Sequence, residues 1–342
     1  MNSEAIYPPL PAPFTARSAT LDDVEDVVEL VNACAIELTG EPRVSVQDVC
    51  SDWQQPGFEL ETDALLVFSP GGELVGHVEL WDNEYVRIYV DGDVSPECRG
   101  QGIGTVLCRW AEERARQSIS KAPEGARIVL FQEAFNTDEA AQELLRRQGY
   151  QVMRHSFHMR VEMDEPPPEP AVPAGLIIRP FIRGQEERAV VMAVYEAFRD
   201  QWGFVERPFE QVYQEWMHLM ETHPDVDPSL WFVAVDEHAN EIAGTTFGHP
   251  TWGEDPEMGW IFGVGVRRPW RRRGLALALL QHCLGALYRR GRRTVGLGVD
   301  AQSLTGATRL YEKAGMHVYR QFVHYGKELR PGEELSTQAA AD

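Results

Sequence analysis

The chain has 342 residues and a formal net charge of −21, from 53 acidic and 32 basic side chains, and 43% of its residues are hydrophobic. This length fits two globular domains, each large enough to bury a core. The acidic excess argues against a general nucleic-acid-binding surface and a polybasic membrane anchor, because both need positive charge.

The first residues, MNSEAIYPPLPAPF, lack the basic and apolar regions of a secretory signal. No apolar run approaches the ~20 residues that a membrane-spanning helix needs. The five cysteines have no CxxC spacing, so we expect neither a disulfide framework nor a zinc site. These features predict a cytoplasmic protein without a bound metal.

The first half of the chain alternates strand and helix patterns in a definite order. A strand-like entry with an arginine, FTARS, precedes an amphipathic helix, and ALLVFSPGGELVGHVEL then has the pattern of a strand pair. The next strand leads into the loop CRGQGIG and a second helix. A buried strand, RIVLFQEAF, a short helix that ends at Gly149 and a final strand follow.

A proline-rich stretch, MDEPPPEPAVPAG, divides the sequence. Proline lacks a backbone donor and favours extended geometry, so this composition is typical of a semi-rigid linker. We expect a first domain over residues 1–163, a linker over 164–175 and a second domain over 176–342.

The second half repeats the pattern of the first. The entry arginine, the loop glycine and the glycine that ends the short helix recur at offsets of 162, 172 and 166 residues, in the pairs Arg17 and Arg179, Gly102 and Gly274, and Gly149 and Gly315. This long period indicates a duplicated domain rather than a solenoid of short repeats. The predicted fold is α+β: two domains, each a mostly antiparallel mixed sheet flanked by helices.

Each half carries an Arg/Gly loop between a strand and a helix, RGQGIG in the first and RRRGLA in the second. Free N–H groups at a helix N-terminus attract anions, and small residues allow a ligand to approach the backbone. Arginine side chains add further attraction for a phosphate. The same loop at equivalent points of a duplicated domain therefore predicts two anion-binding loops.

At these loops, and in the segment TGATRLYEKAGM, the sequence resembles the GCN5-related N-acetyltransferase (GNAT) family over nearly all of both halves. The tandem arrangement, with EAFRDQWGF early in the second half, resembles the mycothiol-synthase-type branch. The resemblance implies acetyl-CoA as co-substrate. It also implies coenzyme contacts in the second half at Val264, Val266, Arg271, Arg272, Arg273, Gly274, Leu275 and Ala276, and in the first half at Val94, Arg99, Gly100, Gln101, Gly102, Ile103 and Gly104.

The family often uses a tyrosine near the end of the short helix as the proton donor to the departing thiolate. A tyrosine stays protonated at neutral pH and can donate in the transition state. By this resemblance Tyr311 is the general acid, whereas the corresponding residue of the first half is Leu145, which cannot donate a proton. We therefore expect catalysis in the second domain and a first domain that does not catalyse.

The remaining site residues are predicted with alternatives. Ser303 occupies a coenzyme-binding position where the family often has asparagine, as Asn136 does in the first half. Glu257 is the first candidate for the general base and Asp255 the second. His249 and His324 are single histidines in strand-like contexts, which favours structural roles.

The acceptor site is expected at FRDQWGF, where Asp200 could attract a cationic amine and Trp202 could pack over an apolar or sugar face. The predicted partner is a small-molecule amine, with no nucleic acid and no membrane. The alternative from another class is a regulatory or sensor protein that binds acyl-CoA without catalysis. Nucleic-acid binding through RRPWRRR is disfavoured, and monomer and homodimer both stay open.

Overall fold

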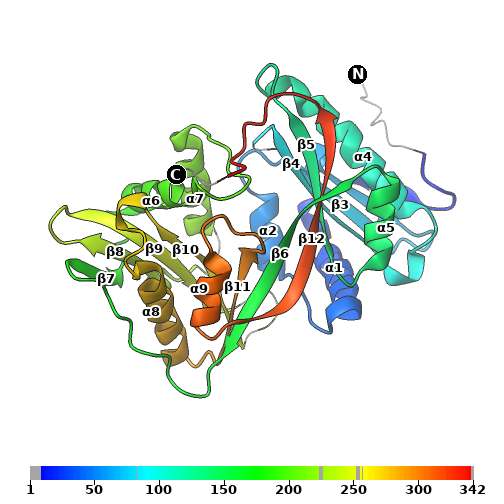
Figure 1. Ribbon diagram of the computed structural model, residues 1–342. Helices are drawn as coiled ribbons and strands as arrows, with labels where there is room; N and C mark the ends of the chain where they lie inside the picture. Colours follow the sequence, from blue (N-terminus) through cyan, green and yellow to red (C-terminus); the bar gives the residue numbers. More distant parts are fainter. Residues whose placement is uncertain (1–8, 83, 223–225, 252–254, 256, 340–342) are drawn as a thin grey trace. The chain divides into compact units, whose positions relative to one another are not determined.

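The computed structural model describes residues 9–82, 84–222, 226–251, 255 and 257–339. The chain divides into two compact units: unit 1 contains Met1–Arg154 and Phe322–Leu335, and unit 2 contains His155–Gln321 and Ser336–Asp342. Both have the predicted mixed sheet, mostly antiparallel and flanked by helices (Figure 1). The α+β prediction is confirmed.

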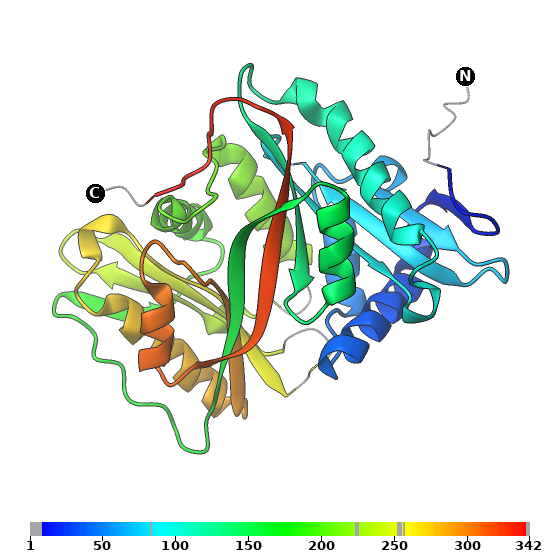
Figure 2. The ribbon, with the colours of Figure 1, turned by 45° about the vertical axis from the view of Figure 1, so that its right-hand side comes forward.

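The sheet of unit 1 has the strand order β1-β2-β3-β4-β5-β12, and only the neighbours β4 and β5 are parallel. A side chain at Gly76 would meet Ile103 of α4, whereas Trp53 of α2 bonds to Glu79, which points to the other face of the same strand. Helix α4 therefore covers one face and α2 the other (Figure 2). The elements are β1 (Thr15–Ser18), α1 (Val24–Thr39), α2 (Val46–Trp53), α3 (Leu60–Asp63), β2 (Ala64–Phe68), β3 (Leu74–Trp81), β4 (Arg87–Val94), α4 (Ile103–Ser118), β5 (Ile128–Phe135) and α5 (Glu139–Arg147).

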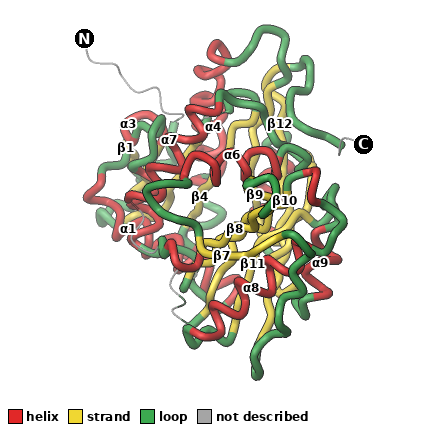
Figure 3. Tube along the Cα trace, turned by 90° about the vertical axis from the view of Figure 1, so that its left-hand side faces the viewer, coloured by secondary structure: helices red, strands yellow, loops and turns green. Residues whose placement is uncertain are grey.

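The sheet of unit 2 has the order β6-β11-β10-β9-β8-β7, and its one parallel pair is β10 with β11. Side chains at Gly265 and Gly244 would meet Phe198 of α6 and Leu279 of α8, respectively, so these helices cover opposite faces (Figure 3). The elements are β7 (Leu176–Pro180), α6 (Glu187–Phe198), α7 (Phe209–Thr222), β8 (Trp231–Asp236), β9 (Glu241–His249), β10 (Met258–Val266), α8 (Leu275–Arg289), β11 (Thr294–Asp300) and α9 (Ala307–Lys313).

The last strand of each sequence half belongs to the unit formed by the other half. Strand β6 (Gln151–Glu162) pairs with β11 of unit 2 through residues 156–162, and β12 (His317–Arg330) pairs with β5 of unit 1 from Phe322 onward. The predicted linker at residues 164–175 divides the chain in sequence order. It does not predict that β6 and β12 each join the sheet of the other half. The strand that completes each sheet is therefore remote in sequence from the strand with which it pairs.

The entry arginines of the two halves have the same structural task. Arg17 lies 2.5 Å from Asp23, just before α1, and Arg179 lies 2.6 Å from Glu186, just before α6. Each ion pair joins the first strand of a sequence half to the start of the first α-helix of that half. The hydrogen bond from the arginine lowers the pKa of each carboxyl group.

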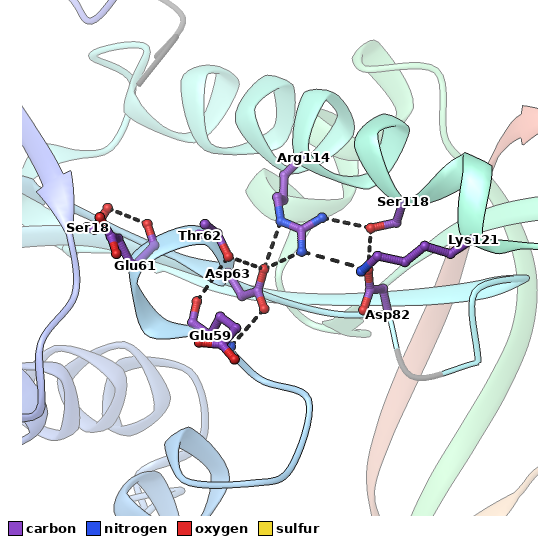
Figure 4. A network of polar contacts seen from close by, with 9 residues as sticks. All are labelled: Ser18, Glu59, Glu61, Thr62, Asp63, Asp82, Arg114, Ser118 and Lys121. Carbon is purple, nitrogen blue, oxygen red and sulfur yellow. Dashed lines mark hydrogen bonds and ion pairs between the residues drawn. The ribbon is translucent and has the colours of Figure 1, made fainter. Parts of the chain in front are cut away.

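A buried polar network fixes helix α4 in unit 1 (Figure 4). Arg114 donates to Asp63 at 2.7 Å and to Ser118 at 2.7 Å, and the Ser118 hydroxyl donates to Asp82. Lys121 completes the group at 3.2 Å from Asp82. The two aspartates are buried, and buried carboxylates require such partners. The network ties α4 to the ends of β2 and β3.

Candidate active site

The loop between β10 and α8 exposes backbone N–H groups at the start of a helix. Arg272 and Gly274 have positive φ values of 60° and 87°, and α8 begins at Leu275. Within the described residues, no acceptor is recorded for the N–H groups of Arg272, Arg273, Gly274, Leu275 and Ala276. Successive free N–H groups at a helix N-terminus form a concave anion-binding site.

The corresponding loop of unit 1 has the same backbone geometry. Gly100 and Gly102 have φ values of 77° and 90° and match Arg272 and Gly274 in position. A side chain at Gly102 would lie 3.2 Å from Pro11, whereas at Gly274 it would meet no atom of the described residues within 4 Å. The loop of unit 1 is thus approached by the N-terminal segment, and that of unit 2 is open.

Gly104 serves packing in unit 1. A side chain there would meet Leu144 of α5 at 2.8 Å, so a glycine allows α4 and α5 to approach closely. Arg99 places its guanidinium 2.5 Å from Glu37, and Cys34 donates to the carbonyl of Val94 at 3.4 Å. The side chain of Arg99 and the carbonyl of Val94 therefore have partners within unit 1. The loop N–H groups from Gly100 to Gly104, including those of Gln101 and Ile103, have no recorded acceptor among the described residues.

The parallel strands of unit 2 separate just before the loop. Pairing of β10 with β11 ends at Ile261 and Leu297, and the register of β10 shifts there, so that Phe262 bulges out with 60% of its surface exposed. Beyond this point β10 pairs only with β9, and β11 pairs with β6. The facing edges of β10 and β11 therefore leave backbone groups for an extended ligand.

Unit 1 has the same opening. Its parallel pairing of β4 with β5 ends at Val90 and Gln132, and no further pair between these strands follows in the described residues. The two units therefore share both an open strand pair and an anion-binding loop, as a duplication predicts.

Asp200 is buried beneath the arginines of the unit 2 loop. Its carboxylate lies 2.5 Å from both Arg268 and Arg271, and Arg271 also donates to the carbonyls of Val266 and Ala197 at 2.9 and 3.0 Å. Hydrogen bonds from Arg268 and Arg271 hold the pKa of Asp200 well below its usual value, against the opposing effect of burial. Because the Asp200 carboxylate is already paired with two guanidinium groups, the geometry argues against the prediction that it attracts an acceptor amine.

The five arginines of VRRPWRRR form two groups, three with carboxylate partners and two without an ion-pair partner among the described residues. Arg267, Arg268 and Arg271 bond to carboxylates within unit 2, Arg267 to Glu196 at 2.5 Å. The side chain of Arg271, predicted to contact the coenzyme, is turned into the protein, although its backbone stays in the loop. Arg272 and Arg273 are exposed and have no ion-pair partner among the described residues. The Arg273 guanidinium also donates to the carbonyl of Ala174 at 3.3 Å.

The side chains of Val264 and Val266 pack toward α8 with Leu275 and Leu279. Only the backbone of these valines can therefore face a ligand, and the Val266 carbonyl already accepts from Arg271. Ala276 packs partly against the same cluster.

Tyr311 is a buried residue of unit 2. It is 7% exposed and belongs to the apolar cluster that contains Ile261 and Leu297, the last paired residues of the two strands. Burial raises the pKa of Tyr311 to about 12, so the phenol stays protonated at neutral pH. Within the described residues no hydrogen bond of its hydroxyl is recorded.

Ser303 caps α9. Its hydroxyl accepts the N–H of Ala307 at 3.2 Å and lies 3.2 Å from the hydroxyl of Thr305. The Ser303 hydroxyl thus holds the first N–H of the helix that carries Tyr311, and its role in coenzyme binding stays a prediction.

Glu257 lies at the wrong end of β10 for a direct role at the loop. It is exposed in the turn before Met258, and its N–H donates to Asp255 at 2.9 Å. The bulge at Phe262 lies five positions further along the chain, which is roughly 16 Å along an extended strand. This position argues against Glu257, and equally Asp255, as the direct proton acceptor.

His249 lies closer to the bulge than either carboxylate. It is 6% exposed, opposes Trp260 across the strands, and its ring meets that of Phe262 edge-on at 5.5 Å. Nδ1 lies 2.8 Å from the carbonyl of Thr251, a contact that a proton on Nδ1 satisfies and that leaves the lone pair on Nε2. The sequence favours a structural role because His249 is a single histidine in a strand-like context, and the contact with Thr251 is seen only in the structure.

Trp202 follows α6 and is partly exposed. Its Nε1 donates to Gln338 at 3.0 Å, which fixes the indole within unit 2.

Three comparisons with known proteins agree with this geometry. A sequence profile described as the Acetyltransferase (GNAT) family matches residues 25–150 and 191–316. Both matches stop before the exchanged strands β6 and β12. The search for membrane spans found no helix of sufficient length and apolarity among the described residues.

The similar proteins cover nearly the whole chain. The mycothiol acetyltransferase of Streptomyces scabiei (strain 87.22) is 29% identical over 319 residues, 92% of this chain and 94% of that protein. That of Streptomyces bingchenggensis (strain BCW-1) is 30% identical over 326 residues, 91% and 97% of the two chains.

Solved structures show the same tandem architecture. A GCN5-related N-acetyltransferase from Sphaerobacter thermophilus has a TM-score of 0.79 and 40% identity, covering 96% of this chain and 100% of that one. A tandem GNAT protein from the clavulanic acid biosynthesis pathway has a TM-score of 0.70 and 19% identity, covering 94% and 100%, and shows likeness of fold alone.

Proposed function

Because the chain belongs to the acetyltransferase (GNAT) family, we propose that it transfers an acetyl group from acetyl-CoA to the amine of a small molecule, and that unit 2 carries out the transfer. The observation that carries this assignment is the contrast between Tyr311 and Leu145. The two residues occupy equivalent helix positions, and only the tyrosine has a proton to donate. The sequence halves 1–163 and 176–342 would then be the non-catalytic and the catalytic half.

The loop of unit 2 fits the pyrophosphate of the coenzyme. Its free N–H groups, from Arg272 to Ala276, would hold the phosphate oxygens, and the guanidinium groups of Arg272 and Arg273 would add positive charge at the rim. The backbone of β10 after Phe262 would hold the extended arm. When bound, acetyl-CoA supplies the thioester whose carbonyl carbon the amine attacks.

In this proposal the amine attacks the thioester carbonyl directly, and residues of unit 2 donate and accept the protons. A C–N bond forms as the C–S bond breaks, the amine loses a proton and the sulfur gains negative charge. The Tyr311 hydroxyl would donate a hydrogen bond to that sulfur, and its high pKa keeps the donor proton in place. His249, rather than Glu257, would accept the amine proton at Nε2.

Asp200 would position the loop rather than bind the acceptor. By holding Arg268 and Arg271 it fixes the end of α6 against the strand–loop junction, and Trp202 follows directly on the same segment. Mycothiol synthesis is the first activity to test, because the similar proteins include mycothiol acetyltransferases.

Unit 1 supports a second, narrower proposal. It keeps the anion-binding loop and the open strand pair but has Leu145 in place of the tyrosine, which favours coenzyme binding without transfer. If both units behaved in this way, the protein would be an acyl-CoA sensor.

One experiment separates the enzyme from the sensor. Acetyl-CoA consumption is followed with a panel of small amines that includes the desacetyl precursor of mycothiol, and coenzyme binding is measured in parallel. We expect turnover with at least one amine. Tight binding of acetyl-CoA with no free coenzyme released across the panel would support the sensor instead.

A further inference from the structure

Residues close to the C-terminus bind to the segment that follows α6 in unit 2. Unit 2 includes the chain from Ser336 onward. Thr337 pairs with this segment through two backbone hydrogen bonds: its N–H donates to the carbonyl of Phe204 at 2.8 Å, and its carbonyl accepts the N–H of Gly203 at 2.7 Å. We name residues 336–338 the C-terminal strap.

Two side chains of the strap bond to the same segment. The Thr337 hydroxyl donates to the carbonyl of Arg199 at 3.0 Å. The side-chain oxygen of Gln338 accepts from the indole N–H of Trp202 at 3.0 Å. The strap therefore fixes both the backbone and the side chains of the segment that begins at the end of α6.

The end of α6 is also where an arginine of the RRRGLA loop attaches. Arg271 donates to the carbonyl of Ala197 at 3.0 Å and lies 2.5 Å from Asp200. The last carbonyl groups of an α-helix have no partner inside the helix, so donors from elsewhere must satisfy them. Two donors do so here: the Arg271 guanidinium at Ala197, and the Thr337 hydroxyl two residues later. The strap and the loop thus hold the same helix end.

Asp200 connects this helix end to the RRRGLA loop. It follows Arg199 directly, it is 2% exposed, and its carboxylate lies 2.5 Å from both Arg268 and Arg271. A buried carboxylate can hold its partners in one geometry only while its own backbone is fixed. Because a binding site needs its groups within about 0.5 Å of their productive positions, a displaced Asp200 would move Arg271 and the adjoining N–H groups enough to weaken phosphate binding.

We propose that Thr337 is a positioning residue for the coenzyme: its hydroxyl fixes Asp200, and through Asp200 the RRRGLA loop, so that full affinity for acetyl-CoA requires the C-terminal strap. This inference rests on the proposed function, because it takes that loop as the coenzyme site of unit 2. The bond from Thr337 reaches the residue next to Asp200, which favours the loop over Trp202 as the part that the strap positions.

The test compares Thr337→Val, which removes the hydroxyl, with Thr337→Ser, which keeps it. Steady-state kinetics with the best amine of the panel gives kcat and the KM for acetyl-CoA. We expect Thr337→Val to raise this KM about 5-fold and to leave kcat within about 2-fold, because binding of the coenzyme is weakened while the reacting groups are untouched. Thr337→Ser should restore the KM to within about 2-fold of the wild type.

Thr222→Val is the matched control. The Thr222 hydroxyl donates to the carbonyl of His218 at 2.8 Å in the last turn of α7, so this variant loses the same kind of bond at another helix end of unit 2. It should keep the wild-type KM for acetyl-CoA. Calorimetric titration with acetyl-CoA on the same variants measures affinity without turnover, and Thr337→Val should again bind about 5-fold more weakly.

Two results would overturn the proposal. A lower thermal unfolding midpoint of Thr337→Val with unchanged affinity for acetyl-CoA would make the strap a purely structural element. A raised KM for the amine alone would show that the strap positions Trp202 instead. Failure of the proposed function looks different: no amine would be acetylated by the wild type, while weaker binding of acetyl-CoA to Thr337→Val would still support the role of the strap.

Discussion

Leu145 and Tyr311 occupy the same position at the ends of two helices. The carbonyl of Leu145 accepts the N–H of Tyr150 at 3.0 Å, and the carbonyl of Tyr311 accepts the N–H of Met316 at 3.1 Å. In both cases the intervening glycine, Gly149 or Gly315, has a positive φ, of 86° or 85°. The two helices thus end with the same backbone geometry, but only Tyr311 has a side chain that can donate a proton.

Replacing Tyr311 with phenylalanine should lower kcat by about 100-fold, because the departing sulfur loses its hydrogen-bond donor. The KM for acetyl-CoA should change little, since the loop is untouched. Steady-state kinetics with the best amine of the panel measures both quantities. Tyr288→Phe on α8 is the control, and equal kcat in the Tyr311 variant and the wild type would remove the tyrosine from the mechanism.

Variants of His249 and Glu257 distinguish the two candidates for the proton acceptor. His249→Gln should reduce kcat by about 100-fold, whereas Glu257→Gln should leave it within about 2-fold, because the carboxylate lies far along β10. Both variants are measured under identical conditions, with circular dichroism to check the fold. The reverse order of effects would restore Glu257 as the base.

Asp200→Asn should destabilise unit 2 by about 2–3 kcal/mol, since it weakens charged hydrogen bonds to Arg268 and Arg271. The pKa of Asp200 is lowered by folding, so its stabilising contribution is fully present above the unfolded pKa of about 3.9 and is lost as the pH falls from there through the lower pKa of the folded state. The free energy of unfolding of the wild type, measured with urea, should therefore fall more steeply below about pH 4 than that of the variant. Parallel pH profiles of the two proteins would contradict this account.

Arg272→Gly should keep or raise the free energy of unfolding, by up to about 1 kcal/mol, because Arg272 has a left-handed backbone that glycine adopts without strain. The same change removes a phosphate-accessible charge, so acetyl-CoA should bind several-fold more weakly. Thermal unfolding and calorimetric titration measure the two effects separately. Arg273→Ala, which loses charge at a residue without positive φ, should show the weaker binding without added stability.

Arg114→Met should cost about 3–5 kcal/mol of unfolding free energy, because it leaves Asp63 without its arginine partner in a buried site. Arg116→Met on the same helix removes an exposed pair with Glu112 and should cost below about 1 kcal/mol. Urea denaturation of both variants provides the comparison. Similar losses in the two would show that the network in Figure 4 adds little to stability.

The sequence predicts the duplicated α+β fold and the family because those depend on local patterns. Strand alternation, the loop RRRGLA and the glycine at the end of each short helix are all visible in short windows, and the structure and the comparisons confirm the fold and the family. The correspondence between Leu145 and Tyr311 follows from counting back from these glycines.

Other parts of the site depend on contacts between distant residues and could not be predicted. Asp200 looks like a free carboxylate in FRDQWGF, but Arg268 and Arg271, far along the chain, surround it. The register of β3 on β4 brings His77 opposite Asp93, a pairing that no short window of the sequence shows. Likewise, the composition of β6 and β12 indicates strands without indicating which sheet edge each one joins.

The exchange of these strands also sets an order of events during protein synthesis. The edge of β5 must wait for β12, whose pairing segment is made 187 residues after Phe135, from Phe322 onward. At a translation rate of about 5–20 residues per second, this edge stays unpaired for roughly 10–40 s on the ribosome. The first-made half of the polypeptide is thus among the last to be completed, and a ribosome that stalls in the second half leaves a nascent chain with an open sheet edge.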